Sequence, residues 1–293
     1  MIVTATLNPA LHVRYATGRV RLGGTNPVSR VSYRVGGRGL VVARVLHTFG
    51  HEVVAAGLAG GASGEMIRAE LARDAVATQF TWISGESRRV VEVDASDGVI
   101  TTFCEPAPYI TTEELGRLAA DYRSLMADAT VAVLSGSLPA GLPAETYGSL
   151  ATYAAEAGVP VVLDAGGSAL WHGVSRRPAL VIPEPEDSDP AALIASGAKA
   201  VAILTGGAVG AITAEGRWQA ELAGPHAAAA SRVAAPRDAL AAGFVPGIAL
   251  GWTWPDTLAH AVALAAASSP AGEVDLEAYE RLLPDVIVRS PAP

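Results

Sequence analysis

Basic residues, cysteine and long apolar runs are all scarce in this sequence of 293 residues, and each scarcity excludes a class of protein. The 21 basic residues are outnumbered by 29 acidic ones, and the net charge of −8 argues against a surface that binds nucleic acid. Cys104 is the only cysteine, so no intrachain disulfide can form, which agrees with a reducing cytoplasm. No apolar run approaches the length that spans a bilayer, and the first residues indicate a strand rather than a signal peptide. We therefore expect a cytoplasmic protein that binds neither nucleic acid nor a membrane.

Apolar residues make up half of the sequence, and they are arranged as in proteins that alternate strands with helices. Short β-branched runs are followed by stretches rich in alanine and leucine, and from residue 113 onward this order is typical of βαβ units. Thr111 and Glu114 are spaced as a capping box, which predicts that a helix begins there. We therefore expect an α/β fold with a mainly parallel sheet covered by helices on both faces. Strands are expected at residues 2–7, 53–58, 90–93, 99–103, 130–134, 159–163, 180–182 and 200–204, and helices at 39–49, 113–126, 144–157, 238–250 and 256–267.

Two stretches, residues 12–34 and 86–104, break this alternation because they contain short strand-like segments with no helix between them. They predict a small β-sheet that is separate from the main one and acts as a lid over the ends of the main strands. No internal repeat or low-complexity linker interrupts the sequence. We therefore expect residues 1–293 to form one domain that carries this lid.

Glycine and polar residues gather where the expected strands end and the expected helices begin. Asn8 follows the first expected strand, and Gly36-Gly37-Arg38-Gly39 leads into a helix. The backbone N–H groups of such a turn, together with an arginine, are suited to hold a phosphate, although an ordinary tight turn has the same pattern. The carboxyl ends of parallel strands meet at one edge of a sheet, so these segments predict a ligand site there. Four further segments occupy equivalent places, at residues 134–139, 163–167, 205–210 and 237–244.

These segments also carry a resemblance to a known family. They include T-L-N-P-A-L, G-G-x-G-x-x-V-A-R-V-L at residues 36–46, E-P-x-P at 105–108, L-S-G-S-L-P at 134–139 and D-A-L-A-A-G-F at 238–244, in this order. Over essentially its whole length the chain resembles the 1-phosphofructokinase and tagatose-6-phosphate kinase branch of the ribokinase-like PfkB carbohydrate kinases. The resemblance implies a Rossmann-type αβα sandwich with a β-lid and a transferase that uses ATP and Mg²⁺. It also allows a homodimer that pairs through the lid.

Matching positions imply roles for individual residues. Asp238 stands where the family has its general base, which accepts the proton of the sugar hydroxyl while that oxygen attacks the γ-phosphorus. Arg38 and Arg88 match positions that hold the phosphate of the substrate. The implied substrate-binding residues are His12, Gly37, Arg38, Gly39, Arg88, Cys104 and Ser137, the implied nucleotide-binding residues are Thr205, Gly207, Gly210, Ala235 and Pro236, and Glu184 and Asp187 are implied to organise Mg²⁺.

The sequence departs from the family pattern just before the expected base, where Gly-Ala-Gly is replaced by Ala235-Pro236-Arg237. Proline has no N–H to donate to a transferring phosphoryl group, and the loss of one such donor costs roughly 2.7–4 kcal/mol. Arg237 would offset this loss if its guanidinium reached the γ-phosphate, so it is a second candidate catalytic residue. Two functions are open at this stage. One is ATP-dependent phosphotransfer to an alcohol group of a phosphorylated sugar or cyclitol, and the other is an inactive relative that binds a phosphosugar or nucleotide without turnover.

Other departures surround the expected sugar site. His12 replaces an aspartate, and we expect it to be either a hydrogen-bonding wall of this site or an exposed loop histidine. Val90 and Cys104 replace polar residues on the lid, and we expect Cys104 to be a small buried apolar residue rather than a reactive thiol. These changes fit a substrate with fewer hydroxyl groups or one that resembles a cyclitol, or else relaxed selection after the loss of catalysis.

Overall fold

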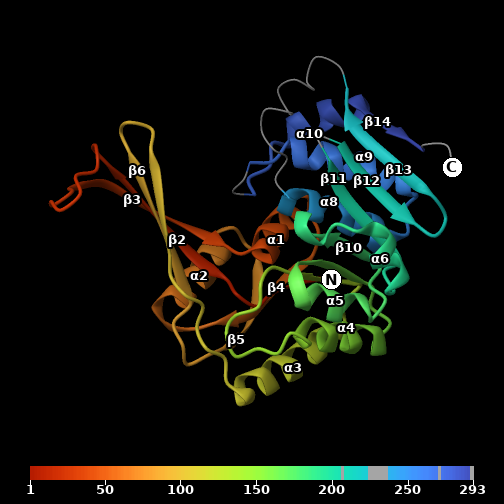
Figure 1. Ribbon diagram of the computed structural model, residues 1–293, viewed down its shortest axis with the longest axis horizontal. Coiled ribbons are helices and arrows are strands. Elements are labelled where there is room, and N and C mark those ends of the chain that lie inside the picture. The colour runs from red at the N-terminus through yellow and green to blue at the C-terminus, as the bar shows by residue number, and fades with distance from the viewer. Residues whose placement is uncertain (206–207, 224–236, 270–271, 291–293) are drawn as a thin grey trace.

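The main sheet of the computed structural model contains ten strands among the residues that it describes, which are 1–205, 208–223, 237–269 and 272–290 (Figure 1). Its strand order is β14-β13-β12-β11-β10-β9-β8-β1-β4-β5. Neighbours from β5 to β11 pair in parallel, whereas β12, β13 and β14 extend the sheet in antiparallel pairs. The prediction of a mainly parallel sheet is therefore confirmed. The strands are β1 (Ile2–Thr6), β4 (Val53–Ala59), β5 (Ala77–Trp82), β8 (Val131–Ser135), β9 (Val161–Ala165), β10 (Leu180–Pro183), β11 (Ala200–Thr205), β12 (Ala208–Thr213), β13 (Arg217–Leu222) and β14 (Val286–Arg289).

Helices cover both faces of this sheet, as the sequence predicts. Helices α1, α2, α8 and α9 bury their apolar side chains against one face, and α3, α4, α5 and α6 against the other. Neighbouring residues of β8 point to opposite faces, so Val133 joins the first cluster and Leu134 the second. The helices are α1 (Arg38–Thr48), α2 (Gly61–Arg73), α3 (Thr112–Met126), α4 (Thr146–Glu156), α5 (Gly167–Val174), α6 (Pro190–Ala195), α8 (Arg237–Leu250), α9 (Trp254–Ala266) and α10 (Leu276–Leu282). Within the described ranges, none of them has both the length and the apolar character to cross a bilayer.

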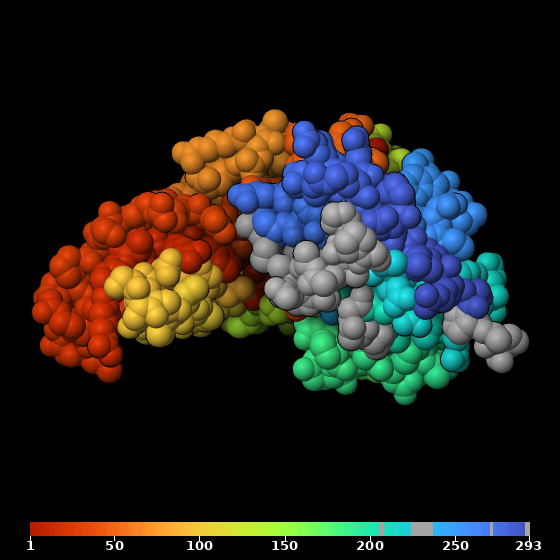
Figure 2. All heavy atoms as spheres, turned by 90° about the horizontal axis from the view of Figure 1, so that it is seen from above, coloured from red at the N-terminus to blue at the C-terminus, as the bar shows by residue number. Residues whose placement is uncertain are grey.

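A second sheet of four strands, which we call the small sheet, has the order β3-β2-β6-β7. It consists of β2 (Ala10–Thr17), β3 (Val28–Gly36), β6 (Arg88–Ala95) and β7 (Ile100–Cys104), and it occupies the two stretches in which the sequence predicts one. In Figure 1 it extends away from the main sheet, beyond α1 and α2, and in Figure 2 it projects on one side of the molecule. The prediction of a separate small sheet is confirmed, and its role as a lid stays a prediction.

The capping box predicted at the start of α3 is present. The Oγ1 atom of Thr111 accepts a hydrogen bond from the backbone N–H of Glu114, and Oε2 of Glu114 accepts one from the backbone N–H of Thr111. The other oxygen of Glu114 accepts from the backbone and hydroxyl of Ser84. Hydrogen bonds from the backbone of Thr111 and Ser84 lower the pKa of Glu114 to about 2. The box therefore also fixes the loop that precedes β6.

The order of the main sheet reverses at β1. The chain passes from β1 to β4 and β5 on one side, and the later strands from β8 to β11 follow on the other side. In open α/β sheets the loops on the two sides diverge at such a point and leave a crevice at the carboxyl ends of the strands. Asn8 follows β1 directly, so the fold places the first predicted binding segment at this crevice.

Candidate active site

Residues from five elements meet at the carboxyl edge of the main sheet. Ser135 ends β8, Asp164 lies near the end of β9, and Glu184 follows β10. Two helices begin at the same edge, α1 at Arg38 and α8 at Arg237. Direct side-chain bonds connect these five residues, so four of the predicted segments converge, at residues 36–39, 134–139, 163–167 and 237–244.

Asp164 is at the centre of this arrangement, and its side chain is fully buried. Its Oδ1 atom accepts hydrogen bonds from Nε and Nη2 of Arg237, at 2.9 and 2.7 Å, and Nη1 of Arg38 lies 3.4 Å away. Its Oδ2 atom accepts the hydroxyl hydrogen of Ser135 at 2.8 Å. Each carboxylate oxygen has about two acceptor positions, so the arginines occupy Oδ1 and Ser135 occupies one position of Oδ2. The sequence analysis gave Asp164 no role, although a charged residue inside the apolar run Val161–Ala165 is a signal that could have identified it.

Arg237 points toward the sheet. Besides its two bonds to Asp164, its Nη2 atom donates to the carbonyl oxygen of Ile182 at 2.6 Å, and its side chain is 22% exposed. To act as an arginine finger on a γ-phosphate, Arg237 would have to leave these partners. That role stays a prediction, and the contacts assign Arg237 a second task, which is to neutralise Asp164.

Arg38 joins the same network from α1. Its Nη2 atom donates to Oε1 of Glu184, in addition to the contact with Asp164. Burial acts to lower the pKa of Arg38, but the nearby charges of Asp164 and Glu184 outweigh it, so the pKa is raised. Glu184 in turn packs against Gly166, where an added Cβ atom would lie 2.8 Å from the carboxyl carbon of Glu184. The predicted phosphate ligand Arg38 is therefore already paired with two carboxylates.

Asp238 is the second residue of α8 and is half-buried, which confirms that it lies at a helix N-terminus. Burial raises the pKa of Asp238 to about 6, and the charge of Asp164 adds to this effect. The guanidinium groups of Arg38 and Arg237 oppose it. A base is most effective when its pKa lies near the working pH, so this carboxylate is suited to accept a proton.

A second polar network lies at the foot of the small sheet. Nε of Arg88 donates to Oδ1 of Asn8 at 3.1 Å, and Nδ2 of Asn8 donates to Oγ of Ser137 at 3.1 Å. This chain joins β6 to the loops that follow β1 and β8. It brings together two predicted substrate-binding residues, and it adds Asn8, which the sequence analysis noted as a loop residue without a specific role.

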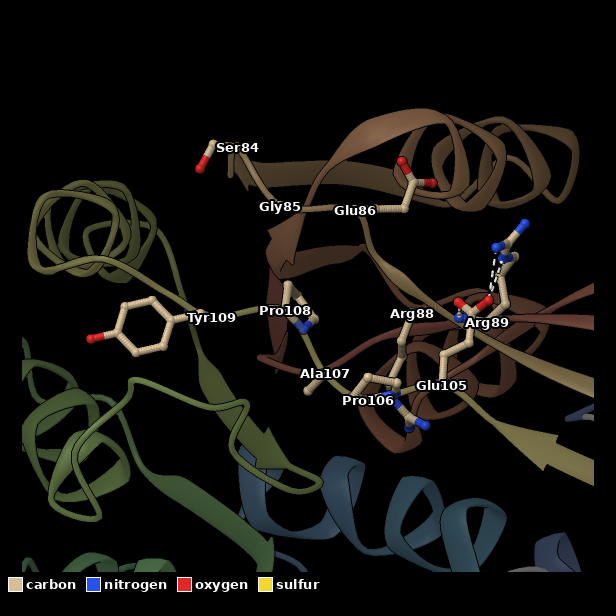
Figure 3. Close-up of a pocket in the computed structure, with 10 residues that line it drawn as sticks. All are labelled: Ser84, Gly85, Glu86, Arg88, Arg89, Glu105, Pro106, Ala107, Pro108 and Tyr109. Carbon is tan, nitrogen blue, oxygen red and sulfur yellow. Dashed lines mark hydrogen bonds and ion pairs between the residues drawn. The ribbon is translucent and has the colours of Figure 1, made fainter.

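Arg88 also lines a cavity of about 680 Å³ between the loop before β6 and the loop after β7 (Figure 3). Figure 3 shows Arg88 and Arg89 pointing in different directions, with Arg89 directed at Glu105. The Arg89 guanidinium is 2.7 Å from Oε1 of Glu105, whereas Arg88 is bonded to a neutral amide. Glu105 therefore neutralises the charge of Arg89, whereas the positive charge of Arg88 is open to an anionic substrate.

The glycines of the G-G-x-G turn have a steric role. Gly37 has a φ of +123°, which side chains rarely adopt, and an added Cβ atom would lie 2.9 Å from Cγ2 of Thr6. A Cβ atom at Gly39 would lie 2.5 Å from Oγ1 of the same threonine. Both glycines let the start of α1 approach β1 closely, which holds Arg38 at the edge of the sheet.

One alternative for His12 and the expectation for Cys104 are wrong, whereas the role of His12 as a hydrogen-bonding wall of the sugar site stays a prediction. His12 does not lie in a loop, because it is part of β2, where its side chain is 34% exposed and its Nδ1 atom lies 3.6 Å from Glu92. Cys104 is exposed rather than buried, because it ends β7, a strand at the edge of the small sheet. Its neighbour across the strand pair, Val90, is buried. Of the two substituted positions, Val90 is buried and Cys104 is not.

The predicted nucleotide residues are described only in part. Thr205 is the last residue of β11, and Gly207, Ala235 and Pro236 lie outside the described residues. Gly210 does not lie in the turn where the sequence analysis expected it, because it sits within β12, opposite Ile203 of β11. The reason is that β11 and β12 pair up to the turn itself, which leaves only residues 206–207 between them.

The acidic residues do not fit a resident metal ion. Within the described part of the chain, no group of three histidine, cysteine or acidic side chains could hold one. Glu184 is paired with Arg38, and Oδ2 of Asp187 accepts the backbone N–H of Gly167 at 2.6 Å. Mg²⁺ needs several oxygen ligands in near-octahedral geometry, so here it would depend on oxygens from outside the protein.

Known proteins share this fold along nearly the whole chain. Two structures of phosphofructokinase-2 from Escherichia coli, one with fructose 6-phosphate and one of its tetrameric inhibited form, each match with a TM-score of 0.83 and 22% identity. Each match covers 97% of this chain and 98% of the other. A carbohydrate kinase from Agrobacterium tumefaciens matches with a TM-score of 0.75 and 15% identity, over 98% of this chain and 99% of its own. At these identities the structural matches establish the fold alone. A model of the pfkB family carbohydrate kinases matches residues 10–271 of this chain. The chain belongs to the pfkB family of carbohydrate kinases.

Proposed function

We propose that this protein transfers the γ-phosphoryl group of ATP to an alcohol group of a phosphorylated sugar or of a sugar-like cyclitol phosphate. The observation that carries the proposal is Asp238, a half-buried carboxylate at the start of α8 whose pKa is raised to about 6. It lies where the family has its general base, beside the positive charges of Arg38 and Arg237. Membership of a carbohydrate kinase family supports the class of reaction.

In the proposed reaction Asp238 accepts the proton of the acceptor hydroxyl. The oxygen of that hydroxyl forms a bond to the γ-phosphorus, and the bond between this phosphorus and the bridging oxygen breaks, so that ADP leaves with the electron pair. Asp238 is then protonated and returns its proton to water. The negative charge of the phosphoryl oxygens would be stabilised by the N-terminus of α8 and by the guanidinium groups of Arg38 and Arg237.

Arg88 is the proposed ligand of the substrate phosphate, because among the described residues its guanidinium is bonded only to a neutral amide, and because it lines a cavity. Asn8 and Ser137 would bind sugar hydroxyls, since they extend the same network toward β1 and β8. His12 and Cys104 belong to the proposed substrate side through their places on the small sheet, which would close over the site as a lid. One structure of the E. coli neighbour holds fructose 6-phosphate, which supports a phosphosugar as the substrate class.

ATP is the proposed donor, and Thr205, Gly207, Ala235 and Pro236 are the residues proposed to bind it. Mg²⁺, bound to the phosphates of the nucleotide, would supply charge neutralisation there. The alternative of an inactive relative rests on the sequence Ala235-Pro236-Arg237, and the family and fold comparisons lend it no support.

The test is an ADP-release assay with a panel of phosphosugars and cyclitol phosphates. On the substrate that gives the highest rate, Asp238→Asn should lower kcat by at least about a hundredfold, the usual contribution of a general base. Asp128→Asn is the matched control, because Asp128 is an exposed aspartate after the end of α3 and should leave kcat unchanged. Absence of ADP release on every substrate, or equal rates for both variants, would refute the proposed function.

A further inference from the structure

The carboxylates at the edge of the sheet are already occupied by cations that belong to the chain itself. Oδ1 of Asp164 faces three donor atoms of Arg237 and Arg38, Oδ2 accepts from Ser135, and the side chain has no exposure to solvent. Glu184 is bonded to Arg38. A hard divalent cation binds through several oxygen atoms, so to use Oδ1 of Asp164 and Oε1 of Glu184 it would have to displace the guanidinium groups.

The balance of charge gives the same result. Asp164, Glu184 and Asp238 bring three negative charges when ionised, and Arg38 and Arg237 bring two positive ones. One negative charge remains, and none remains when Asp238 takes up a proton. A group with a net charge of −1 or 0 attracts a divalent ion less strongly than these carboxylates would without their arginines.

We propose that Arg237 and Arg38 close the Asp164–Glu184 carboxylate pair to free divalent cations. The chain then has no metal ion of its own at this edge of the sheet, and Mg²⁺ enters only as part of the nucleotide complex. The exclusion of free cations from the carboxylates follows from the contacts. The statement that Mg²⁺ enters with the nucleotide rests on the proposed function. Arg237 contributes most to this effect, because it donates two hydrogen bonds to Oδ1 of Asp164, whereas Nη1 of Arg38 lies 3.4 Å from the same atom.

The experiment is a titration of Mn²⁺ with the nucleotide-free protein, in which electron paramagnetic resonance measures the free ion. We expect the wild-type protein to show no site with a Kd below about 1 mM, the weak limit of protein sites for hard divalent cations. Arg237→Gln removes the charge but keeps a side chain that donates hydrogen bonds, and it should bind Mn²⁺ at least about tenfold more tightly than the wild type. Adding Asp164→Asn to this variant should abolish the gain, because Asp164 is the carboxylate that becomes free.

Arg289→Gln is the matched control. Arg289 on β14 forms an ion pair with Glu221 on β13, and the two side chains are 66% and 41% exposed, respectively. It should leave Mn²⁺ binding as in the wild type. If Arg237→Gln does not fold, as judged by circular dichroism, Arg38→Gln removes the other guanidinium and takes its place. Wild-type protein that binds Mn²⁺ as tightly as the variant, or a folded variant with no gain, would overturn the proposal. The titration does not depend on turnover, so a failure of the proposed kinase activity would leave its result intact.

Discussion

Replacing Asp164 with asparagine measures what the buried network contributes to stability. The carboxylate is fully buried, and it neutralises Arg237 and Arg38, whose side chains are 22% and 30% exposed. Asparagine has nearly the same size but no charge, so both guanidinium groups lose a counter-charge. Breaking a buried pair by removing one partner costs about 3–5 kcal/mol. We expect the lower end, about 3 kcal/mol, because both arginines keep some contact with water and Arg38 keeps Glu184.

Thermal unfolding followed by circular dichroism is a suitable assay. A chain of 293 residues has an unfolding entropy of about 0.6 kcal/mol per degree, so a loss of about 3 kcal/mol corresponds to a fall in Tm of about 5 °C. The exposed control Asp128→Asn should shift the Tm by no more than about 1 °C. The double variant Asp164→Asn, Arg237→Gln should lose less than the sum of the two single variants, because the second change removes the unpaired charge that the first one leaves.

Two results would refute this reasoning. A fall in Tm of less than about 1 °C for Asp164→Asn would show that the pair adds nothing measurable to the stability of the fold. Strict additivity in the double variant would show that Asp164 and Arg237 do not interact in solution as their contacts indicate.

Three further predictions address other parts of the molecule. Because burial raises the pKa of Asp238 to about 6, kcat/KM should fall tenfold per pH unit below about pH 6, and a profile that stays flat to pH 5 would contradict its role as the base. Burial, aided by the charge of His51, lowers the pKa of His260 to about 4, so this histidine is neutral in the folded protein. As the pH falls, His260 takes up a proton in the unfolded chain before it does so in the folded protein. The free energy of unfolding should therefore fall by up to roughly 3 kcal/mol between pH 6.5 and pH 4. Equal urea midpoints at pH 7 and pH 5 would contradict this. Ile100 and Phe103 of the small sheet are 53% and 59% exposed, so we expect a dimer through this sheet that Phe103→Asp converts to a monomer in light scattering. A monomeric wild-type protein would rule the dimer out.

The sequence predicts those parts of the fold whose signals are local. The capping box at Thr111 and the β-branched runs of the parallel strands lie within short windows, and both are confirmed. Helix α2 was not predicted, because no side chain near its start caps it. Glu86, which precedes β6, supplies the cap instead by accepting from the backbone N–H groups of Ala62 and Ser63. A cap that comes from more than twenty residues away leaves no local pattern.

The site shows the same limit. Motif positions predicted that Arg38, Glu184, Arg237 and Asp238 would gather at one edge, and they do. The pairing within this group was not predicted, because it joins Asp164 to residues 29, 73 and 126 positions away. Arg237 was expected to point at a phosphate on the basis of its place beside the base. Its actual orientation is decided by a buried carboxylate on β9, which no spacing within its own segment indicates.

The position of Arg237 also changes how the replaced Gly-Ala-Gly segment is interpreted. Taken from the sequence alone, Ala235-Pro236-Arg237 is the loss of one backbone donor, at Pro236. In the structure, Arg237 supplies two of the hydrogen bonds that Asp164 accepts and raises the positive charge around Asp238. A glycine at residue 237 would therefore do more than allow a closer approach of the backbone to a phosphate. It would also leave Asp164 short of a cation, and because the charge of Asp164 raises the pKa of Asp238, it would shift the base as well. Residues 38, 164, 184, 237 and 238 act as one electrostatic unit, so their substitutions should be non-additive and need to be tested in pairs.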